Sequence, residues 1–255
     1  ALIGERGREV REFIENDLGA EGLKKSIIVC VTSDQSALMR MRGAFVATAI
    51  AEYFRNDGKN VFLLIDSLTR VAHAQREIGL SAGEPPTSKG YPPTVFAELP
   101  KLLERAGQGR ANEGSITGLF TVLVEGDDTN EPISDTVRGI LDGHIIMDRA
   151  IAQRGRFPAI NILKSVSRTM PDCNTQQENA LVQTARRLLS TYEDMAEMIR
   201  LGAYRKGSDP EVDQAIQYYQ PLEDFLRQRK DEQTSLEEGY DQLAALLGLA
   251  NWRGV

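Results

Sequence analysis

The sequence predicts an α/β domain, built as a parallel sheet flanked by helices, followed by an all-α C-terminal domain. Up to about residue 172, short apolar runs rich in β-branched residues alternate with long helical patterns, which is typical of a parallel sheet. Beyond residue 174, long helical patterns follow one another with no β-branched run between them. We therefore expect two domains, residues 1–172 and residues 173–255.

The first part of the chain reads as strand, helix, strand and helix. Residues 1–3 look like the end of a buried strand, and a strand needs neighbours, so we expect the natural protein to continue upstream. Gly58 is expected to end a long helix, and Asp66 follows a buried strand. The expected strands are residues 27–32 and 61–65, and the expected helices are residues 35–56 and 67–78.

The amino-acid composition changes at residue 79, where glycine and proline become too frequent for a helix or a central strand. We expect a long exposed loop over residues 79–93, and loops of this length are often functional. Continuous apolar runs further on favour strands buried on both faces of a parallel sheet. The elements expected after the loop are a helix at 94–106, a strand at 116–124, an acidic turn at 125–131, a short helix, a strand at 144–147, and helices at 178–202, 209–229 and 236–249.

The composition of the chain argues against several classes of function. The chain carries 30 Lys and Arg against 37 Asp and Glu, a net charge of −7, and no basic run, so nucleic acid is not an expected partner. The two cysteines show no metal-binding spacing, and we expect them to be plain thiols in a reducing cytoplasm. Because no apolar stretch reaches the ~18 residues that span a membrane, any membrane contact is expected to be peripheral.

Two carboxylates follow expected strand ends. Asp66 stands at the edge of a parallel sheet where ligands bind, and in a nucleotide hydrolase such an aspartate holds Mg²⁺, usually through a water. The alternative is a cap for the following helix. Glu5 stands between a strand end and a helix, where its carboxylate could orient an attacking water. The alternative for Glu5 is a first-turn glutamate that complements the helix dipole.

Two further residues carry functional alternatives. Arg168 ends an expected strand near the domain boundary, where its planar cation could reach the γ-phosphate held by a neighbouring subunit. A surface arginine paired with an acid is the other interpretation. Phe157 lies between Arg156 and Pro158 in a loop and suits stacking on a base, although a hydrophobic plug would look the same.

Some nucleotide-binding and metal signatures are missing. The sequence contains no Gly-x-Gly-x-x-Gly and no His-Glu-x-x-His. It also lacks the Gly-x-x-x-x-Gly-Lys-Ser/Thr loop, whose backbone N–H groups and lysine supply most of the grip on phosphates. For any nucleotide enzyme, the missing loop is a serious gap.

Taken together, the chain resembles the catalytic ATPases of flagellar and type III protein export, which are themselves similar to the catalytic subunit of rotary ATP synthases. The resemblance spans nearly the whole chain and lies in ordered stretches. They include GERGREV at 4–10, LLIDSLTR at 63–70, GEPP at 83–86, VLVEGDD at 122–128 and SVSR at 165–168. Within the family, residues 40–45 and 200–207 look more like the flagellar branch.

The resemblance implies a RecA-like nucleotide-binding domain that is incomplete at its N-terminus, with the phosphate loop upstream of residue 1. We therefore expect these 255 residues alone to bind ATP weakly and to hydrolyse little of it. It implies a cytoplasmic enzyme that hydrolyses ATP with Mg²⁺ to energise protein transport. The roles that it implies are water polarisation for Glu5, a place near the γ-phosphate for Arg6, action on Mg²⁺ through water for Asp66, adenine stacking for Phe157 with Tyr219 and Leu222, and a cross-subunit arginine finger for Arg168.

The resemblance also implies partners. It predicts a hexameric ring whose central channel takes a coiled-coil stalk protein, contacted by the loop at 79–91 and the segment at 205–211. Regulatory, chaperone and export-gate proteins are further implied partners, with peripheral association at the inner-membrane export apparatus. The alternatives are a non-catalytic nucleotide-binding ring subunit and a rotary ATP synthase-type subunit. Glu5, Asp66 and Arg168 together favour an enzyme, since non-catalytic subunits usually carry a non-acidic residue in place of Glu5.

Overall fold

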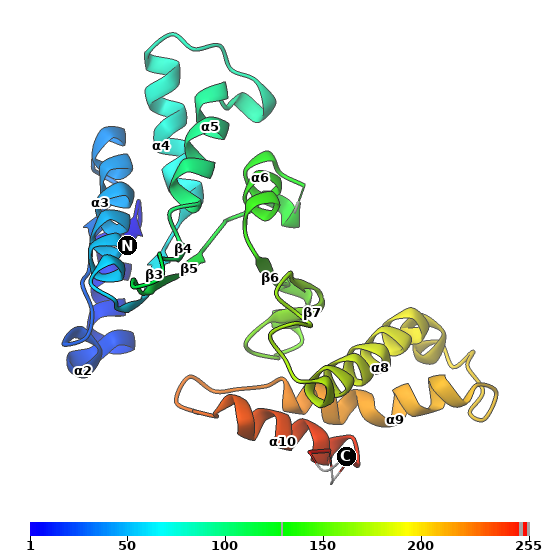
Figure 1. The fold of residues 1–255 in the computed structure, drawn as a ribbon. Coiled ribbons are helices and arrows are strands. Elements are labelled where there is room, and N and C mark those ends of the chain that lie inside the picture. The colour runs from blue at the N-terminus through cyan, green and yellow to red at the C-terminus, as the bar shows by residue number, and fades with distance from the viewer. Residues whose placement is uncertain (129, 250–251, 254–255) are drawn as a thin grey trace. The chain divides into compact units, whose positions relative to one another are not determined.

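The computed structural model describes residues 1–128, 130–249 and 252–253. The chain divides into two compact units, Ala1–Leu141 and Asp142–Val255, which are treated separately below. Figure 1 shows mixed strands and helices in the first unit and, in the second, a pair of strands followed by long helices. The α/β nucleotide-binding fold with a helical C-terminal region is therefore confirmed, whereas the domain boundary near residue 172 stays a prediction.

The first unit contains a parallel strand arrangement. Strand β3 pairs in parallel with β5, β1 pairs in parallel with β2, and β1 also bridges to the end of β3 through Leu2 and Asp66. A short antiparallel strand, β4, borders β5 and was not expected from the sequence. The strands are β1 (Leu2–Ile3), β2 (Cys30–Val31), β3 (Asn60–Ile65), β4 (Gly107–Gln108) and β5 (Ser115–Phe120).

Two long helices of this unit, α3 and α5, begin at a side-chain cap and at a proline. Ser36 accepts a hydrogen bond from the Met39 N–H and starts α3, and Pro93 occupies the first turn of α5, where its missing N–H costs nothing. The helices are α1 (Gly7–Glu12), η1 (Phe13–Leu18), α2 (Gly19–Leu23), α3 (Ala37–Asn56), α4 (Leu68–Ser81), η2 (Ser88–Gly90), α5 (Pro93–Leu103), η3 (Glu125–Asp127) and α6 (Pro132–Ile140).

The sheet of this unit is covered on one face. Helix α3 packs on the strands with small residues such as Ala44, and Leu63 and Ile65 of β3 are buried beneath it. Phe62 and Leu64 alternate with them along β3 and are exposed, because successive side chains of a strand point to opposite faces. On the neighbouring strand β5, Ile116 is buried and Leu119 is exposed, so the expectation that the later apolar runs are buried on both faces is wrong for this structure.

The second unit starts with two antiparallel strands and ends in helices. β6 and β7 pair with a bulge between His144 and Ile146, so this part of the sheet is not parallel as the apolar runs suggested. Capping boxes at Thr175 and Ser235 start two of the long helices. Its elements are β6 (Gly143–Met147), α7 (Arg149–Gln153), β7 (Ile160–Ser167), α8 (Gln176–Arg200), α9 (Pro210–Phe225) and α10 (Leu236–Leu246).

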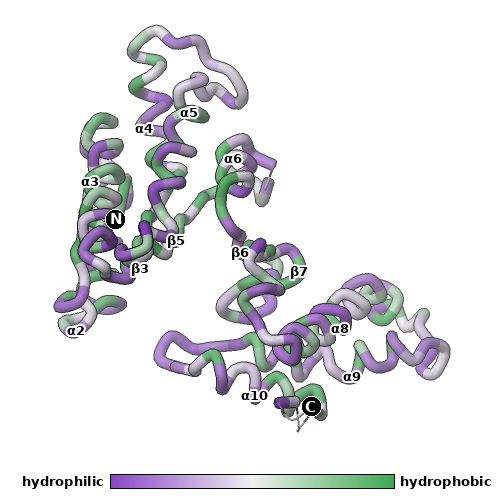
Figure 2. Tube along the Cα trace, viewed as in Figure 1, coloured by the Kyte–Doolittle hydropathy of each residue, from purple (hydrophilic) through white to green (hydrophobic). Residues whose placement is uncertain are grey.

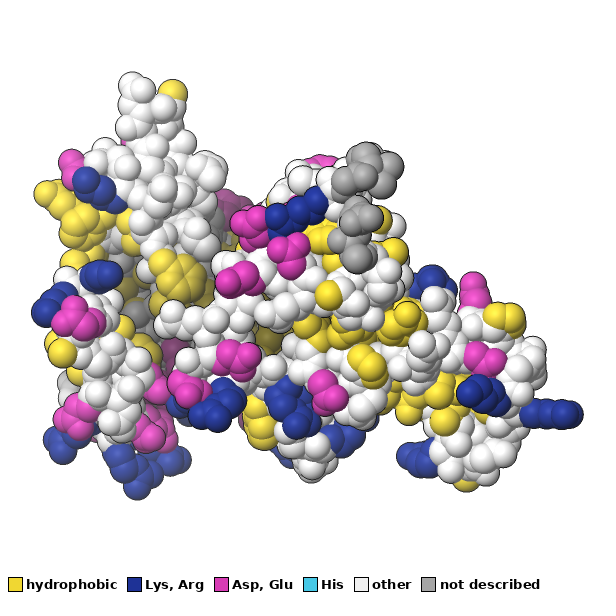
Figure 3. Space-filling model, turned by 90° about the horizontal axis from the view of Figure 1, so that it is seen from below, with side chains coloured by type: hydrophobic (Ala, Val, Ile, Leu, Met, Phe, Trp, Pro, Cys, Tyr) yellow, Lys and Arg dark blue, Asp and Glu magenta, His cyan; other side chains and the backbone are white. Residues whose placement is uncertain are grey.

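The C-terminal helices share one core, in which α8, α9 and α10 contact one another through residues such as Leu188, Leu222 and Leu243. Figure 2 shows hydrophobic and hydrophilic residues interspersed along α8 and α10, as expected for helices that bury one face. In Figure 3, Lys and Arg side chains lie among Asp and Glu on the face shown. Among the described residues, no helix is long and apolar enough to span a membrane.

Candidate active site

The carboxyl ends of the strands in the first unit bring two of the expected site residues together. The Ile3 N–H donates to the Asp66 carbonyl at 2.7 Å, and the Asp66 N–H donates to the Ala1 carbonyl at 2.9 Å. These bonds place β1 alongside the end of β3, so Glu5 and Asp66 leave the sheet at the same edge. This edge of a parallel sheet is where open α/β folds bind ligands.

The side chain of Asp66 faces the next strand rather than capping a helix. Its Oδ1 accepts a hydrogen bond from the Thr121 hydroxyl at 2.5 Å, just beyond the end of β5. The N-cap of α4 is Ser67, which makes no side-chain capping bond. The capping alternative for Asp66 is therefore wrong in this structure, and one carboxylate oxygen is held by the sheet edge.

Glu5 lies in the turn between β1 and α1. Helix α1 begins at Gly7 and carries Glu9 in its first turn, so Glu5 is not the first-turn glutamate that the alternative required. Burial raises the pKa of the Glu5 carboxyl above its ordinary value of 4.5, and the nearby carboxylate of Asp66 raises it further. The positive charge of Arg70 opposes this shift without cancelling it.

Arg70 is a further candidate site residue, which the sequence analysis did not single out. Gly4 has a φ of +76°, and a Cβ there would lie 2.8 Å from the Arg70 Cβ, so the arginine stem packs against a position that only glycine can fill. Its position was the available signal, since residue 70 lies in the first turn of the helix that follows Asp66. Within the described residues, the buried Nε of Arg70 and the Oγ of Ser67 have no hydrogen-bond partner.

Arg6 is not directed into this group. Its guanidinium lies 3.6 Å from the Glu9 carboxylate on the surface of α1, and its side chain is 72% exposed. The predicted role of Arg6 near the γ-phosphate stays a prediction.

The second unit holds the expected base-binding residues. Phe157 is 57% exposed, which is wrong for a hydrophobic plug and suits a stacking surface. Tyr219 on α9 stacks on Tyr192 of α8, with ring centroids 3.6 Å apart and an interplanar angle of 11°. Leu222 is 1% exposed in the helical core, behind the surface that solvent reaches.

Arg168 follows the last residue of β7. Its backbone N–H donates to the Asp142 carbonyl at 2.6 Å, next to the pairing of Gly143 with Ser167. The strand pair thus fixes where the arginine leaves the sheet, and its side chain is exposed to solvent. Glu5 and Asp66 belong to the first unit, and Arg168 and Phe157 to the second.

The donor set of the first unit fits a single-carboxylate Mg²⁺ site. The described residues contain no group of three or more His, Cys, Asp or Glu side chains that could hold a metal ion by themselves. Mg²⁺ is commonly held by one or two carboxylates together with substrate phosphates and water, which Asp66 can satisfy. The unsatisfied Arg70 Nε, a buried donor at the same edge, suits an anion such as a phosphate.

Comparisons with known proteins agree with these observations. Residues 1–167 match the nucleotide-binding domain of the ATP synthase alpha/beta family, and residues 174–245 match the T3SS EscN ATPase C-terminal domain. The flagellum-specific ATP synthase of Bacillus subtilis (strain 168) is 61% identical over 249 residues, which are 97% of this chain and 56% of that protein. The type 3 secretion system ATPase of Xanthomonas euvesicatoria is 52% identical, covering 96% of this chain and 55% of that protein.

A solved structure is similar over the same extent. The assembled ATPase EscN from the enteropathogenic E. coli type III secretion system has a TM-score of 0.92 and 47% identity, covering 96% of this chain and 59% of that chain. The chain thus spans about half the length of the curated relatives it matches. On the matched domains and the sheet-edge geometry together, the chain belongs to the ATP synthase alpha/beta family, within its group of flagellar and type III secretion ATPases.

Proposed function

We propose that this chain forms most of the catalytic core of an ATPase that energises flagellar or type III protein export. The observation that carries the proposal is the meeting of Glu5, Asp66 and Arg70 at one edge of the sheet, with a buried arginine donor left without a partner. Membership of a nucleotide-binding family supports ATP as the substrate. The 61% identity to a flagellum-specific ATP synthase, with residues 40–45 and 200–207, favours the flagellar branch.

In the proposed reaction, a water attacks the γ-phosphorus of ATP and the bond to the bridging oxygen breaks, giving ADP and phosphate. The Glu5 carboxylate orients this water and accepts its proton. A pKa raised above the ordinary value makes Glu5 a better proton acceptor near neutral pH than a fully solvated glutamate. Asp66 keeps one oxygen on Thr121, and its other oxygen would hold Mg²⁺ through a water.

When bound, Mg²⁺ neutralises charge on the transferring phosphates. Arg70 donates to a phosphate oxygen from its buried Nε, and Arg6 adds a second cation after leaving Glu9. The phosphate loop, which the sequence lacks, would come from the remainder of a complete protein. We assign residues 1–172 to the nucleotide-binding domain and residues 173–255 to the helical domain of that protein.

The second unit contributes base binding and a cation. Phe157 and Tyr219 provide aromatic surfaces for the adenine, with Leu222 packed behind Tyr219. Arg168 acts on the γ-phosphate held by the next subunit of a hexameric ring. Head-to-tail contacts between identical subunits close into rings, and the E. coli relative has been described in an assembled form.

The proposed partners include a coiled-coil stalk protein in the ring channel. A relative, EscN, has been solved in complex with its central stalk EscO, at a TM-score of 0.87 to this chain. The two segments of this chain that are expected to contact the stalk, residues 79–91 and 205–211, are each held by side-chain interactions. Lys89 pairs with Asp128 at 3.2 Å, and the Tyr204 hydroxyl donates to Asp213 at 3.0 Å next to the basic turn before α9.

We place the complete protein in the cytoplasm, peripheral to the inner-membrane export apparatus, with regulatory, chaperone and export-gate proteins as further partners.

The competing proposal is a non-catalytic ring subunit or a rotary synthase subunit. Glu5 argues against a non-catalytic subunit. Its half-buried carboxylate has a raised pKa, and shifted pKa values of this kind are typical of catalytic sites.

The test is steady-state ATP hydrolysis by the complete protein and its Glu5→Gln variant, with nucleotide binding measured separately. We expect turnover to fall ~100-fold or more while binding is retained, since general-base groups commonly contribute ~10²–10⁴-fold. The matched control is Glu12→Gln on the exposed side of α1, which should keep the parent rate. A Glu5→Gln protein with near-parent turnover would exclude the proposed role of Glu5.

A further inference from the structure

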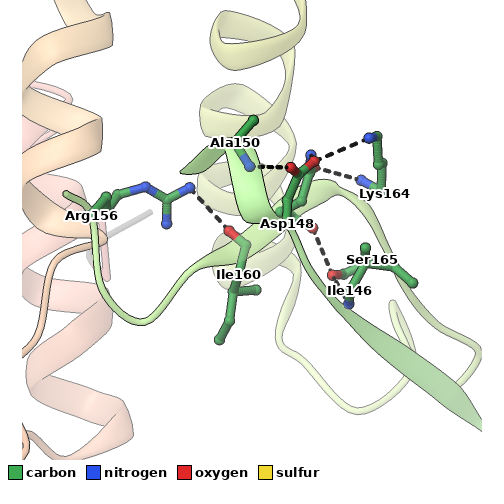
Figure 4. A network of polar contacts seen from close by, with 8 residues as sticks. Ile146, Asp148, Ala150, Arg156, Ile160, Lys164 and Ser165 are labelled. Carbon is green, nitrogen blue, oxygen red and sulfur yellow. Dashed lines mark hydrogen bonds and ion pairs between the residues drawn. The ribbon is translucent and has the colours of Figure 1, made fainter. Parts of the chain in front are cut away.

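A buried ion pair supports the exposed loop that carries Phe157. The side chain of Arg156 is only 6% exposed, and its Nε donates to the Glu223 carboxylate on α9 at 2.9 Å. The same guanidinium donates through Nη2 to the Ile160 carbonyl at 3.0 Å and through Nη1 to the Pro158 carbonyl at 3.4 Å. Figure 4 shows Arg156 reaching toward Ile160, where β7 begins.

The backbone around Phe157 is thereby fixed on both sides. Arg156 precedes it and binds the carbonyl of Pro158, which follows it. The Phe157 carbonyl itself accepts the Gln228 N–H at 2.9 Å, from the segment just after α9. The ring of Phe157, by contrast, is 57% exposed, so a rigid backbone presents a solvent-facing aromatic surface.

The ion pair also ties this loop to the helix face that carries Tyr219. Glu223 lies four residues after Tyr219 on α9, so the two side chains share one face of that helix. Arg156, Tyr219 and Glu223 line one shallow hollow of the second unit. A shift of Arg156 would therefore change where Phe157 sits relative to Tyr219.

Stability alone does not explain a buried arginine at this position. Replacing a buried ion pair by apolar residues of similar size is often neutral or stabilising, because both charges lose their hydration. An arginine offers five N–H donors in a rigid planar fork that reaches acceptors on several sides, whereas the three donors of a lysine share one rotatable ammonium. The contacts of Arg156 to Glu223, Pro158 and Ile160 therefore fix the position of the loop backbone relative to α9.

We propose that Arg156, acting through Glu223, is a positioning residue that holds Phe157 relative to Tyr219 for the purine base of a nucleoside triphosphate. The inference rests on the proposed function above. It assigns Arg156 to base recognition and leaves the phosphate chemistry to Glu5, Asp66 and Arg70. Loss of the pair should therefore weaken ATP binding and leave the rate of the bound complex unchanged.

The test uses the complete protein with both partners replaced, Arg156→Met with Glu223→Met, so that no unpaired charge is buried. We expect the KM for ATP to rise about tenfold, the scale of one base stacked on an aromatic ring, with kcat within about twofold. The inhibition constant of inorganic tripolyphosphate, which has no base, should not change.

The thermal midpoint of the paired Met variant should stay the same or rise. If the ion pair only stabilised the fold, its loss would lower the thermal midpoint. Arg156→Lys keeps the positive charge and should raise the KM less, and Arg149→Gln at an exposed position of α7 is the matched control.

A double-mutant cycle with Phe157→Leu shows whether Arg156 acts through Phe157. We expect the paired Met variant to add nothing to the KM in the Phe157→Leu background. Additive effects in the cycle, an unchanged KM, or an equal loss in kcat and in tripolyphosphate binding would each overturn the inference. A parent protein without Mg²⁺-dependent hydrolysis would instead overturn the proposed function, and the two failures are distinguished by this parent measurement.

Discussion

At the residue scale, the absence of a side chain at Gly4 allows a positive charge to lie near Glu5. Gly4 leaves room for the stem of Arg70, and the arginine then lies close enough to Glu5 to lower its pKa. Burial and Asp66 outweigh that effect, so the net shift is upward. The carboxylate of Glu5 is therefore less stable in the folded protein than in water, and this cost has a measurable consequence.

The consequence is a pH-dependent gain of stability in Glu5→Gln. A folded pKa above the unfolded value of 4.5 means that the native state binds the proton more tightly, so Glu5 destabilises the fold as pH rises through its folded pKa. Urea titrations should show Glu5→Gln more stable than the parent at about pH 7.5 and nearly equal to it well below pH 4.5. A variant that is less stable than the parent at neutral pH would show that the sign of the shift is wrong.

At the element scale, the close approach of α3 to the short strands holds the sheet edge in place. A Cβ at Gly43 would lie 2.5 Å from the Val31 Cγ2 and 2.9 Å from the Ile3 Cδ1, both in the core. Gly43→Ala should therefore lower the free energy of unfolding by up to about 2 kcal/mol, because overpacking costs ~1–3 kcal/mol and the gain in helix propensity offsets ~1 kcal/mol of this. Denaturant unfolding measures this, with Gly239→Ala on α10 as the control, since no atom of the described residues lies within 4 Å of a Cβ there. Equal effects of the two substitutions would contradict this packing account.

The elements also show what the sequence could and could not predict. Strand β3 and helix α3 were located to within a few residues, because their apolar runs and stop signals are strong. Asp66 was correctly placed at a strand end for the same reason. The antiparallel pairing of β6 with β7 and the exposure of Phe62 could not be predicted, since pairing direction and coverage of a sheet depend on distant segments. Arg70 was missed because its proximity to Glu5 depends on the conformation of Gly4.

At the scale of the whole molecule, the proposed catalytic groups lie in two compact units of one chain. Glu5 and Asp66 come from the first unit, and Arg168 from the second. In a ring, this arrangement allows one subunit to supply the water-orienting carboxylate and its neighbour to supply the arginine. The expectation that the 255 residues alone hydrolyse little ATP follows from the missing phosphate-binding motif and stays a prediction.

The most direct test of this shared site mixes two variants of the complete protein, Glu5→Gln and Arg168→Ala. Each alone should retain little activity, because cross-subunit arginines contribute ~10³-fold or more in related enzymes. In rings assembled from an equal mixture, about a quarter of the interfaces would pair an intact Glu5 with an intact Arg168, so ATP hydrolysis should recover to about a quarter of the parent rate. Mixing Glu5→Gln with the double variant should restore nothing. A mixture of the single variants that forms rings and stays as inactive as its components would contradict a site shared between subunits.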